Sequence, residues 1–460
     1  MQASAELAPG SERVGIELQS EHVAAAAAFG KVSRADIFRM NLALDIDWTS
    51  EYPLFVIGNP PWVTSAGLNR MESKNLPVKE NFKGARGLEA VLGSSNFDVC
   101  EYIILKLISE LGRTPFTLGM LCKTQVARNV IAYAHNAELP IAESAIYRID
   151  AMKWFSASVD ACWFTAAVDT TRKRNFTTAV FDCLDDEKPN PPRFGVVDGR
   201  MVADVERYEA VRSADSKCAY EWRSGLKHDA SAVFELVATP APATRAAEPL
   251  DLEMQYVFPF LKSTDVFRGR ESVLSRWVIV PQLTFGADTA LLEHSAPKLW
   301  KYLNLNSAVL DDRKSSIYRN RPRFSVFGHG SYTYAPYKVA ISGLHKKPVF
   351  RLVAPINDRP VVLDDTCYFL PFDDVTEAAL VWALLSSQPC IDLIESLAFW
   401  DAKRPITKKL LARIDLTRLP VDAPAIYSAA ARQVERLGCV LDADKADAVL
   451  NSGAAESVLF

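Results

Sequence analysis

The most constraining feature of this 460-residue sequence is the stretch FVIGNPPW at residues 55–62. Its apolar first half is typical of a buried strand. The two prolines that follow fix two consecutive φ angles and remove two backbone donors, so they end the strand in a rigid turn whose carbonyls stay free. The sequence therefore predicts a buried strand with a rigid loop at its carboxyl end, from Asn59 to Trp62.

Two acids precede this loop at positions where predicted strands end. Glu17 lies in RVGIELQSEHV at 13–23, and Asp36 lies in SRADIF at 33–38. Either acid alone would be an ordinary strand-end carboxylate. In the order Glu17, Asp36 and Asn-Pro-Pro-Trp, the three segments resemble the adenine-N6 DNA methyltransferases that carry a TaqI-like or Eco57I-like target-recognition domain. That resemblance implies that the cofactor is S-adenosyl-L-methionine.

The resemblance also assigns roles to these residues. It implies that Glu17 holds the ribose hydroxyls of the cofactor, that Asp36 meets its adenine amino group and that Asn59 lies beside the methyl donor. The amide oxygen of Asn59 and the main-chain carbonyl of Pro60 can each accept one N–H of the target amine, in a turn that Pro61 keeps rigid. Orientation, rather than a strong base, would then do most of the catalysis.

Aromatic residues complete the predicted site. Trp62 offers a flat apolar face to an unstacked base, and the resemblance assigns the opposite face to Phe155, in the loop of IYRIDAMKWFSASVDACWFTAAV at 146–168. A base inside a duplex reaches such a pocket only by flipping. Trp154 and Trp163 are expected in the core. The alternative for a bare NPPW is a proline-rich turn capped by a core tryptophan.

One part of the family pattern is missing. The glycine-rich loop after the first strand should precede Gly15, but MQASAELAPGSER contains no strand-like run and no Gly-x-Gly. The resemblance implies that this strand lies in the centre of the sheet, between GIEL and LFVIGN, so its loss would leave backbone groups unpaired. We expect a separate polypeptide or a longer version of the protein to supply it. A degenerate cofactor site is the alternative.

Composition sets the background. The chain is 49% hydrophobic and 23% charged, which is ordinary for a soluble protein of two or three domains. It has no apolar stretch as long as a membrane span and no basic-then-apolar amino terminus, so we expect a cytoplasmic protein without membrane association. The eight cysteines are scattered without a C-x-x-C pair and are expected to be reduced core residues. We assign no metal.

Local charge favours nucleic acid although the net charge is −4. Basic residues alternate with hydroxyls and aromatics at 311–347 and again at 399–416, a mixture that suits phosphate contacts and base reading, although each run alone could be a solvated face. RKSSIY, SYTYAPYKVAISGL, LDDTCYFLPF and FWDAKRPITKKLL resemble segments of TaqI-like target-recognition domains. The predicted DNA-binding residues are Lys227, Arg313, Lys314, Ser315, Tyr318, Tyr332, Lys338, Lys403 and Arg404, with Tyr334 also considered.

The expected architecture is α/β. A Rossmann-like S-adenosylmethionine-dependent methyltransferase domain, with a mainly parallel sheet and without its first strand and glycine loop, is predicted at 1–175. A connecting segment at 176–249 ends in TPAPATRAAEP, which has linker composition. An α+β DNA target-recognition domain at 250–425 and a helical tail at 426–460 follow.

These observations predict a site-specific DNA adenine-N6 methyltransferase of a restriction-modification or phage-defence system. Its partners would be double-stranded DNA, a possible polypeptide that supplies the glycine loop and a possible cognate restriction endonuclease. Two alternatives stay open. One is an RNA adenine or protein glutamine methyltransferase, which would also use Asn-Pro-Pro-aromatic. The other is a non-catalytic subunit that binds DNA for a partner complex.

Overall fold

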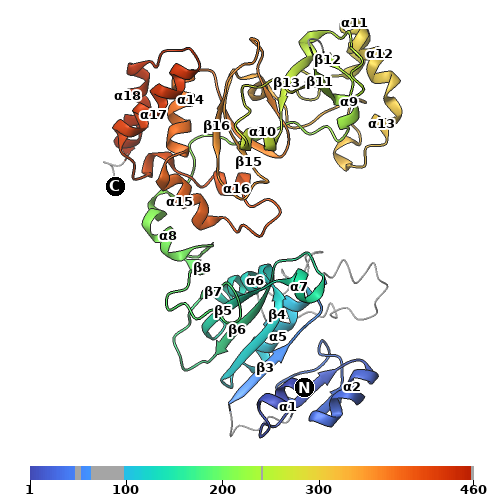
Figure 1. Ribbon diagram of the computed structural model, residues 1–460, viewed down its shortest axis with the longest axis vertical. Helices are drawn as coiled ribbons and strands as arrows, with labels where there is room; N and C mark the ends of the chain where they lie inside the picture. The colour runs from blue at the N-terminus through green and yellow to red at the C-terminus, as the bar shows by residue number, and fades with distance from the viewer. Residues whose placement is uncertain (47–52, 64–97, 240–241, 457–460) are drawn as a thin grey trace. The chain divides into compact units, whose positions relative to one another are not determined.

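The chain folds into two compact units, Met1–Glu206 and Arg207–Phe460, which are described separately. The computed structural model describes residues 1–46, 53–63, 98–239 and 242–456 and is shown in Figure 1. Both units mix helices with sheets, and the described residues contain four sheets. The division falls inside helix α8 (Val205–Val211), beyond the domain end predicted at 175.

The larger sheet of unit 1 has seven strands. In spatial order they are β3 (Leu54–Gly58), β4 (Phe116–Lys123), β6 (Ala161–Val168), β5 (Ile141–Ile149), β7 (Thr177–Phe181), β8 (Arg193–Val197) and β9 (Arg200–Val202). Only the pairs β3 with β4 and β5 with β7 are parallel. The expectation of a mainly parallel sheet is met in part, because β3, β4, β5, β7 and β9 run in one direction, whereas β6 and β8 run opposite to them. The connection from β5 to β6 is too short for a crossover, so β6 returns antiparallel to both of its neighbours.

Helices cover one face of this sheet, and at β3 the described residues leave the other face exposed. Helices α5 (Val99–Leu111) and α6 (Thr124–Asn136) contact each other and β4, and Leu118 and Phe164 are fully buried. Phe55 and Ile57, two residues apart on β3 and so on one face, are 67% and 61% exposed to solvent. Sheets with parallel pairs usually have both faces covered. The described residues thus leave an apolar area at β3 uncovered.

A separate two-stranded sheet precedes β3. Strands β1 (Val14–Glu17) and β2 (Lys31–Arg34) pair in parallel, joined by α2 (Ser20–Ala26) and the 3-10 turn η1 (Ala27–Phe29), and α1 (Gln2–Leu7) lies ahead of them. Among the described residues no strand joins this pair to β3, which forms the end of the larger sheet.

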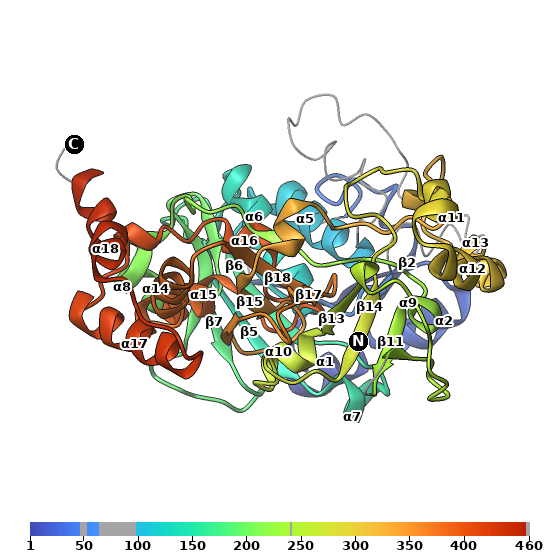
Figure 2. The same ribbon diagram turned by 90° about the horizontal axis from the view of Figure 1, so that it is seen from above.

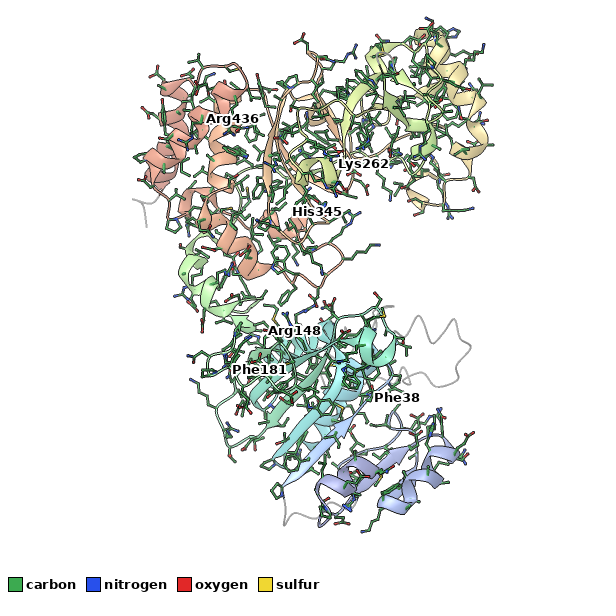
Figure 3. All side chains as sticks on the ribbon, viewed as in Figure 1. Phe38, Arg148, Phe181, Lys262, His345 and Arg436 are labelled. Atoms are coloured by element: carbon green, nitrogen blue, oxygen red, sulfur yellow. The ribbon has the colours of Figure 1, made fainter. Side chains whose placement is uncertain are left out.

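The segment after β2 is attached to helix α5. The Phe38 ring, labelled in Figure 3, lies 5.5 Å from the Tyr102 ring between centroids. The backbone N–H of Leu42 donates to a carboxylate oxygen of Glu110 at 2.8 Å, and Leu42 is completely buried. The small sheet therefore belongs to the same folded unit as the seven strands.

Three buried cysteines lie together in unit 1. Cys100 on α5, Cys122 on β4 and Cys162 on β6 are all reduced, and the sulfurs of Cys122 and Cys162 are 3.9 Å apart. Hydrogen bonds with the two neighbouring thiols and burial raise the pKa of the Cys122 thiol. Cys183, in contrast, is exposed.

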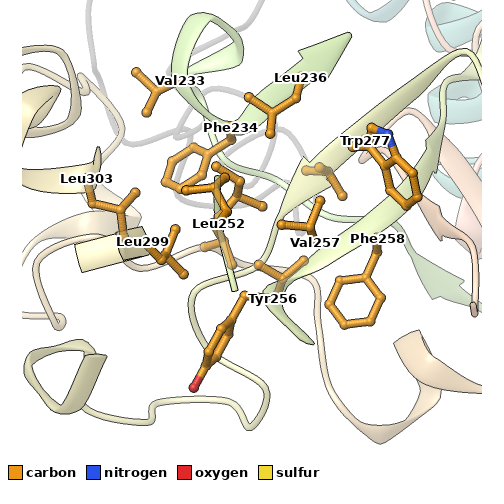
Figure 4. Close-up of a cluster of buried hydrophobic side chains, with 14 of the residues drawn as sticks. Val233, Phe234, Leu236, Leu252, Tyr256, Val257, Phe258, Trp277, Leu299 and Leu303 are labelled. Atoms are coloured by element: carbon orange, nitrogen blue, oxygen red, sulfur yellow. The ribbon is translucent and has the colours of Figure 1, made fainter. Parts of the chain in front are cut away.

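Unit 2 contains two sheets. The first has the order β12 (Pro242–Ala243), β11 (Glu235–Ala238), β14 (Arg276–Ile279), β13 (Val257–Leu261) and β17 (Val362–Leu363). The second has the order β10 (Arg223–Ser224), β18 (Cys367–Phe372), β15 (Tyr337–Ser342) and β16 (Phe350–Val353). The first sheet packs on a core that includes Phe234, Val257, Trp277 and Leu299 (Figure 4).

The predicted linker at 239–249 is partly structural. Strand β12 lies within it and pairs with β11, and Ala243 is completely buried. The high proline content misled the prediction, because proline is tolerated on an edge strand and β12 is an edge. The segment predicted as a connector at 176–249 is instead divided between the two units.

Helices of four to fourteen residues accompany these sheets. They are α9 (Ser231–Phe234), α10 (Ser263–Phe267), α11 (Leu292–Ser295), α12 (Pro297–Leu305), α13 (Ser307–Asp311), α14 (Val375–Leu385), α15 (Gln388–Leu397), α16 (Lys408–Leu411), α17 (Ala423–Arg436) and α18 (Ala443–Glu456). The 3-10 turns are η2 (Arg212–Ala214), η3 (Met254–Tyr256), η4 (Thr289–Leu291), η5 (Ser316–Tyr318), η6 (Ser331–Tyr334) and η7 (Leu416–Arg418).

The carboxyl-terminal helices are part of unit 2. Helices α17 and α18 lie beside α14 in both views (Figures 1 and 2), and the Lys445 ammonium is 2.6 Å from the Asp374 carboxylate. No single helix in the described ranges is long and apolar enough to cross a bilayer. Helices α14 and α15 reach that criterion only as a pair bent by 59°.

Candidate active site and recognition surface

The turn after β3 presents Asn59 to solvent on a fixed support. Asn59 is exposed and Pro60 is buried, while Pro61 is exposed and Trp62 is half-buried. The indole N–H of Trp62 donates to the main-chain carbonyl of Leu121 on β4 at 3.2 Å. Since β3 and β4 run parallel, this bond fixes the tryptophan at the carboxyl end of both strands.

Phe155 meets Trp62 at this edge. It ends the short helix α7 (Ala151–Phe155) after β5, and its ring centroid lies 5.7 Å from that of Trp62 with 75° between the planes. Phe155 is 47% exposed. The structure thus brings together the two aromatics that the sequence singled out.

The neighbouring tryptophans behave differently from each other. Trp154 is 67% exposed, with the Lys153 ammonium 5.3 Å from its ring centroid, so its predicted core position is wrong. Helix α7 has little more than one turn, and only Ala151 within it is buried. Trp163 is partly buried on β6, and its ring packs directly on the backbone of Gly119. A Cβ at Gly119 would lie only 2.6 Å from the Cζ2 atom of this ring, so only glycine leaves room for it.

Asp98 and Lys123 support the site, although the sequence reading passed over both. Asp98 caps α5 by accepting from the Cys100 N–H at 3.0 Å, and its other oxygen lies 2.8 Å from the Lys123 ammonium at the end of β4. The N–H of Val99, the first residue of α5, donates to the carbonyl of Val63 at 3.0 Å. The helix start therefore holds the residue that follows Trp62. An aspartate directly before a helical apolar pattern is the signal that could have revealed this cap.

A second buried acid lies one turn along α5. The Glu101 carboxylate accepts from the side-chain amide of Asn129 on α6 at 2.7 Å. Burial raises the pKa of Glu101, a hydrogen bond with Asn129 opposes that rise, and the charge of Asp98 adds to it. This pair joins the two helices that cover the sheet.

Glu17 and Asp36 follow adjacent parallel strands. Glu17 ends β1 and accepts from the Gln19 N–H at 2.8 Å. Asp36 comes two residues after β2, accepts from the Phe38 N–H at 3.0 Å and lies 3.6 Å from the Arg39 guanidinium. Because β1 and β2 are parallel, both acids lie at the same edge of the small sheet. Each keeps acceptor capacity beyond its single hydrogen bond.

Lys338 cannot contact DNA, so this prediction is wrong. Its side chain is 1% exposed on β15, and its ammonium donates to the carbonyl of Ala335 at 2.5 Å. Burial lowers the pKa of Lys338 to about 7. The strand lies inside its sheet between β18 and β16, so a basic residue there is enclosed.

Arg313 also has an internal role. Its guanidinium donates to the carbonyls of Leu310, His228 and Ser325. It lies 3.8 Å from the Tyr318 ring centroid. Burial lowers the pKa of Arg313 and raises that of Tyr318. Both side chains therefore brace the loop, and the Nε and Nη1 groups of Arg313 are occupied by internal carbonyls.

The other predicted DNA-binding residues lie nearer the surface. Lys314 is exposed, and its ammonium is 2.9 Å from the Asp312 carboxylate. Arg404 is 3.6 Å from Asp365, and Lys403 beside it is exposed.

The remaining three are partly buried. Lys227 and Ser315 are half-buried, and the Lys227 ammonium is 3.5 Å from the Asp229 carboxylate. Tyr332 is half-buried against Phe369, with the Arg223 guanidinium 4.6 Å from its ring centroid.

Tyr334 belongs to the core side of the same turn. Its ring lies 5.1 Å from the Phe258 ring between centroids, and it packs against the core of the first sheet in unit 2. Tyr334 is therefore part of the packing around this core.

Comparison with known proteins gives one relative over most of the chain. The chain is 37% identical over 417 residues to the type II methyltransferase M.NspV of Nostoc sp. (strain ATCC 29411 / PCC 7524), across 87% of this chain and 85% of the relative. No protein-family profile matches the sequence.

Two solved structures align with most of this chain. The type IIL restriction-modification enzyme MmeI in complex with DNA matches 89% of this chain at a TM-score of 0.52 and 13% identity. The type IIG restriction endonuclease BpuSI matches 87% at a TM-score of 0.28 and 14% identity. The chain spans about half the length of each, 52% and 51% respectively. The likeness to MmeI shows a common fold and no more.

Proposed function

The chain belongs to the type II methyltransferases, on its 37% identity to one of them, and from this premise we propose that it methylates adenine N6 in DNA at a flipped base. Membership supports a DNA methyltransferase of a restriction-modification system. The observation that carries the finer proposal is the meeting of Trp62 and Phe155 beside the exposed Asn59. Two aromatics at the end of a rigid turn suit a planar base, and an adjacent amide oxygen suits its amino group.

The chemistry assigned to the turn is acceptance and orientation. The amide oxygen of Asn59 and the carbonyl of Pro60 each accept one N–H of the adenine amino group, which frees the nitrogen lone pair from the ring and aims it. Bound S-adenosylmethionine supplies the methyl group. No side chain has to act as a strong base, because the positioned acceptors are strongest for the charge that develops in the transition state.

Glu17 and Asp36 fit the cofactor because their carboxylates are hydrogen-bond acceptors. Carboxylates at the carboxyl ends of parallel strands occupy the usual ligand edge of an α/β sheet. Their oxygens can accept from ribose hydroxyls and from an amino group respectively. Within the proposal, β1 and β2 carry these two contacts as part of a Rossmann-like domain.

The two aromatics must separate when a base enters. A ring stacked on both faces needs about 7 Å between its neighbours, twice an ordinary contact distance. Trp62 and Phe155 are 5.7 Å apart and nearly perpendicular. Trp62 is held by its bond to Leu121, whereas Phe155 is carried by the five-residue α7. We therefore assign the movement to Phe155.

A further strand completes the catalytic domain in this proposal. Strand β3 ends the larger sheet, β1 and β2 form a sheet of their own, and the face with Phe55 and Ile57 is open. An apolar strand between β1 and β3 would pair with the end strand of the larger sheet and join it to the small sheet. A glycine turn and a helix after that strand would cover the exposed face with Phe55 and Ile57. It would come from another polypeptide or from a longer form of this protein.

Calorimetry tests this completion. We expect the purified 460-residue chain to bind S-adenosylmethionine weakly or not at all, because no described residue supplies the glycine turn that this proposal places against the methionine moiety. Binding at low micromolar concentration would overturn the completion and would leave the methyltransferase assignment intact.

Mass spectrometry of DNA tests the reaction. DNA from cells that carry the gene should contain N6-methyladenine at one sequence, and DNA from cells without the gene should not. N4-methylcytosine at that sequence would show that the target base is cytosine and would keep the enzyme class. Absence of either mark, with methylation of RNA or of a protein glutamine, would instead favour the other methyltransferase classes. No methylation at all would favour a subunit that only binds DNA.

A further inference from the structure

A turn in unit 2 presents an exposed phenylalanine. Phe285 is 58% exposed and lies in the segment between β14 and η4. The Ala287 N–H donates to the Thr284 carbonyl at 3.2 Å, and Gly286 has a φ of +78°. A hydrogen bond across four residues with a positive φ at the third is the pattern of a type II turn. Phe285 occupies the second position, at the corner.

The turn is anchored from below. Gln282 is 2% exposed, and its side-chain N–H donates to the Ala287 carbonyl at 2.6 Å. Its side-chain oxygen accepts from the Val326 N–H at 3.3 Å. One buried amide thus links both ends of the turn to a neighbouring segment, so the ring is presented on a fixed base and loses little freedom on binding.

An aromatic and a cation lie beside the exposed ring. Phe327 packs against Phe285 with ring centroids 6.1 Å apart and planes at 71°. The Arg321 guanidinium carbon is 5.8 Å from the Phe285 centroid and 6.0 Å from that of Phe327. Arg321 and the nearby Arg319 are exposed, and neither forms a recorded ion pair within the described residues. The nearest acid in the turn, Asp288, accepts from the Ala290 N–H.

We propose that Phe285 stacks on a base of the bound DNA at an opened base step, with Arg321 on the adjoining phosphate. The proposal rests on the proposed function and names a contact that specifies how the duplex is held. An uncovered ring beside a guanidinium without a carboxylate partner matches a ligand that carries a flat aromatic face and an anion side by side, as a nucleotide does. An apolar side chain between base steps opens and bends the duplex.

Two substitutions separate stacking from charge. Phe285→Ala should weaken affinity for a duplex containing the methylated sequence about 5- to 150-fold, the range for one base-aromatic stack, without changing the dependence on salt. Arg321→Ala should weaken affinity and lower the salt slope by about one unit. Phe285→Trp should restore near wild-type affinity, since indole also stacks. Leu305→Ala, at a 77% exposed apolar residue of the same unit, is the matched control and should change nothing.

Gel-shift titrations at two salt concentrations give the answer. If wild-type protein binds the duplex and Phe285→Ala binds equally well, stacking by Phe285 is wrong and the proposed function stands. If Phe285→Ala lowers affinity no more than Leu305→Ala and Phe285→Trp does not bind better, the result is the same. Failure of the wild-type protein to bind any duplex would refute the proposed function itself.

Discussion

Asn59 is exposed, whereas the residues after it are held in place: Pro60 is buried and Trp62 is bonded to Leu121. This contrast separates a residue available for chemistry from residues that support it. The sequence alone could predict it, because an Asn-Pro-Pro turn after an apolar strand leaves few other conformations. The resemblance predicted that Phe155 faces Trp62, but the sequence could not show that the two rings touch directly, because that contact depends on the packing of β5 against β6 and β7.

Replacing Asn59 by alanine tests its acceptor role. In the complete enzyme, Asn59→Ala should lower turnover by about two to three orders of magnitude, because the acceptor acts mainly in the transition state. DNA affinity should stay nearly unchanged. Asn59→Asp keeps an acceptor oxygen and should retain more activity than the alanine variant. Methylation of cellular DNA near the wild-type level by Asn59→Ala would rule out this role.

Lys338 shows where residue-level reading failed. It lies in a run of basic and aromatic residues that resembles a surface, yet its strand has neighbours on both sides. Lys403, in a similar run, is exposed because it lies in the loop before α16. Burial depends on which strands pair, and a basic residue carries no local sign of it.

The buried lysine should make stability depend on pH. Burial lowers the pKa of Lys338 to about 7, from an ordinary value of 10.5. Between these values the unfolded chain binds a proton that the folded chain does not, so the free energy of unfolding should rise with pH across that interval. Below about pH 7 the loss of stability is complete. Lys338→Met should flatten this rise and stabilise unit 2 by about 2–3 kcal/mol at pH 7.

Urea unfolding at several pH values measures this effect. Lys314→Met is the matched control, since Lys314 is 87% exposed, and should leave the pH dependence unchanged. If Lys338→Met kept the wild-type rise between pH 7 and 10, another group would be responsible.

At the scale of elements, the sequence identified strands and helices better than their pairing. The apolar run at 55–58 lies in β3, although no residue of this strand is fully buried as predicted. The segment at 146–168 contains the end of β5 and the returning strand β6 as expected, but the predicted loop between them includes the short helix α7. The prediction of a mainly parallel sheet was only partly right, because strand direction depends on how the chain returns, and β6 returns antiparallel after a helix of only five residues. Likewise, proline and alanine composition at 239–249 could not distinguish a linker from the edge strand β12.

The start of α5 should affect both stability and catalysis. Asp98→Ala removes the helix cap and leaves Lys123 without its 2.8 Å partner. We expect a loss of about 2–3 kcal/mol in the free energy of unfolding of unit 1. Because the Val99 N–H holds the Val63 carbonyl, turnover should fall more than DNA affinity.

Asp98→Asn separates the two contributions. An amide oxygen still caps the helix but does not carry the charge that pairs with Lys123, so stability should drop by about 1 kcal/mol and turnover should remain close to wild type. Equal losses of turnover in Asp98→Ala and Asp98→Asn would show that the ion pair with Lys123, not the helix cap, positions the turn.

The whole molecule is a mixed α/β protein of two units, and the relative confirms the broad class that the motifs indicated, a type II methyltransferase. The domain end predicted at 175 differs from the observed division after Glu206 because β7, β8 and β9 continue the sheet. Turn-rich strands and loop composition look alike in sequence, so sequence composition alone did not mark the unit boundary.

Binding of DNA by unit 2 should depend on local charge and not on the net charge of −4. Replacing Lys403 and Arg404 together by alanine should weaken duplex affinity for all sequences and lower the slope of log affinity against log salt by about 1.8, or 0.9 for each phosphate contact. The control pair Arg432→Ala and Arg436→Ala removes two exposed charges from α17. An unchanged slope in the first pair, or an equal change in both, would contradict the assignment of this surface.

The buried thiols of Cys100, Cys122 and Cys162 can report local unfolding of unit 1. An alkylating reagent reacts with a thiolate and so with Cys183 at once, because that residue is exposed. The three buried sulfurs become reactive only when β4 and β6 separate from α5. The rate at which they are alkylated therefore measures how fast this core opens. Buried Cys390 gives the same reading for the other unit. Peptide masses from one labelled sample would therefore show which half of the chain loosens first, with no added probe.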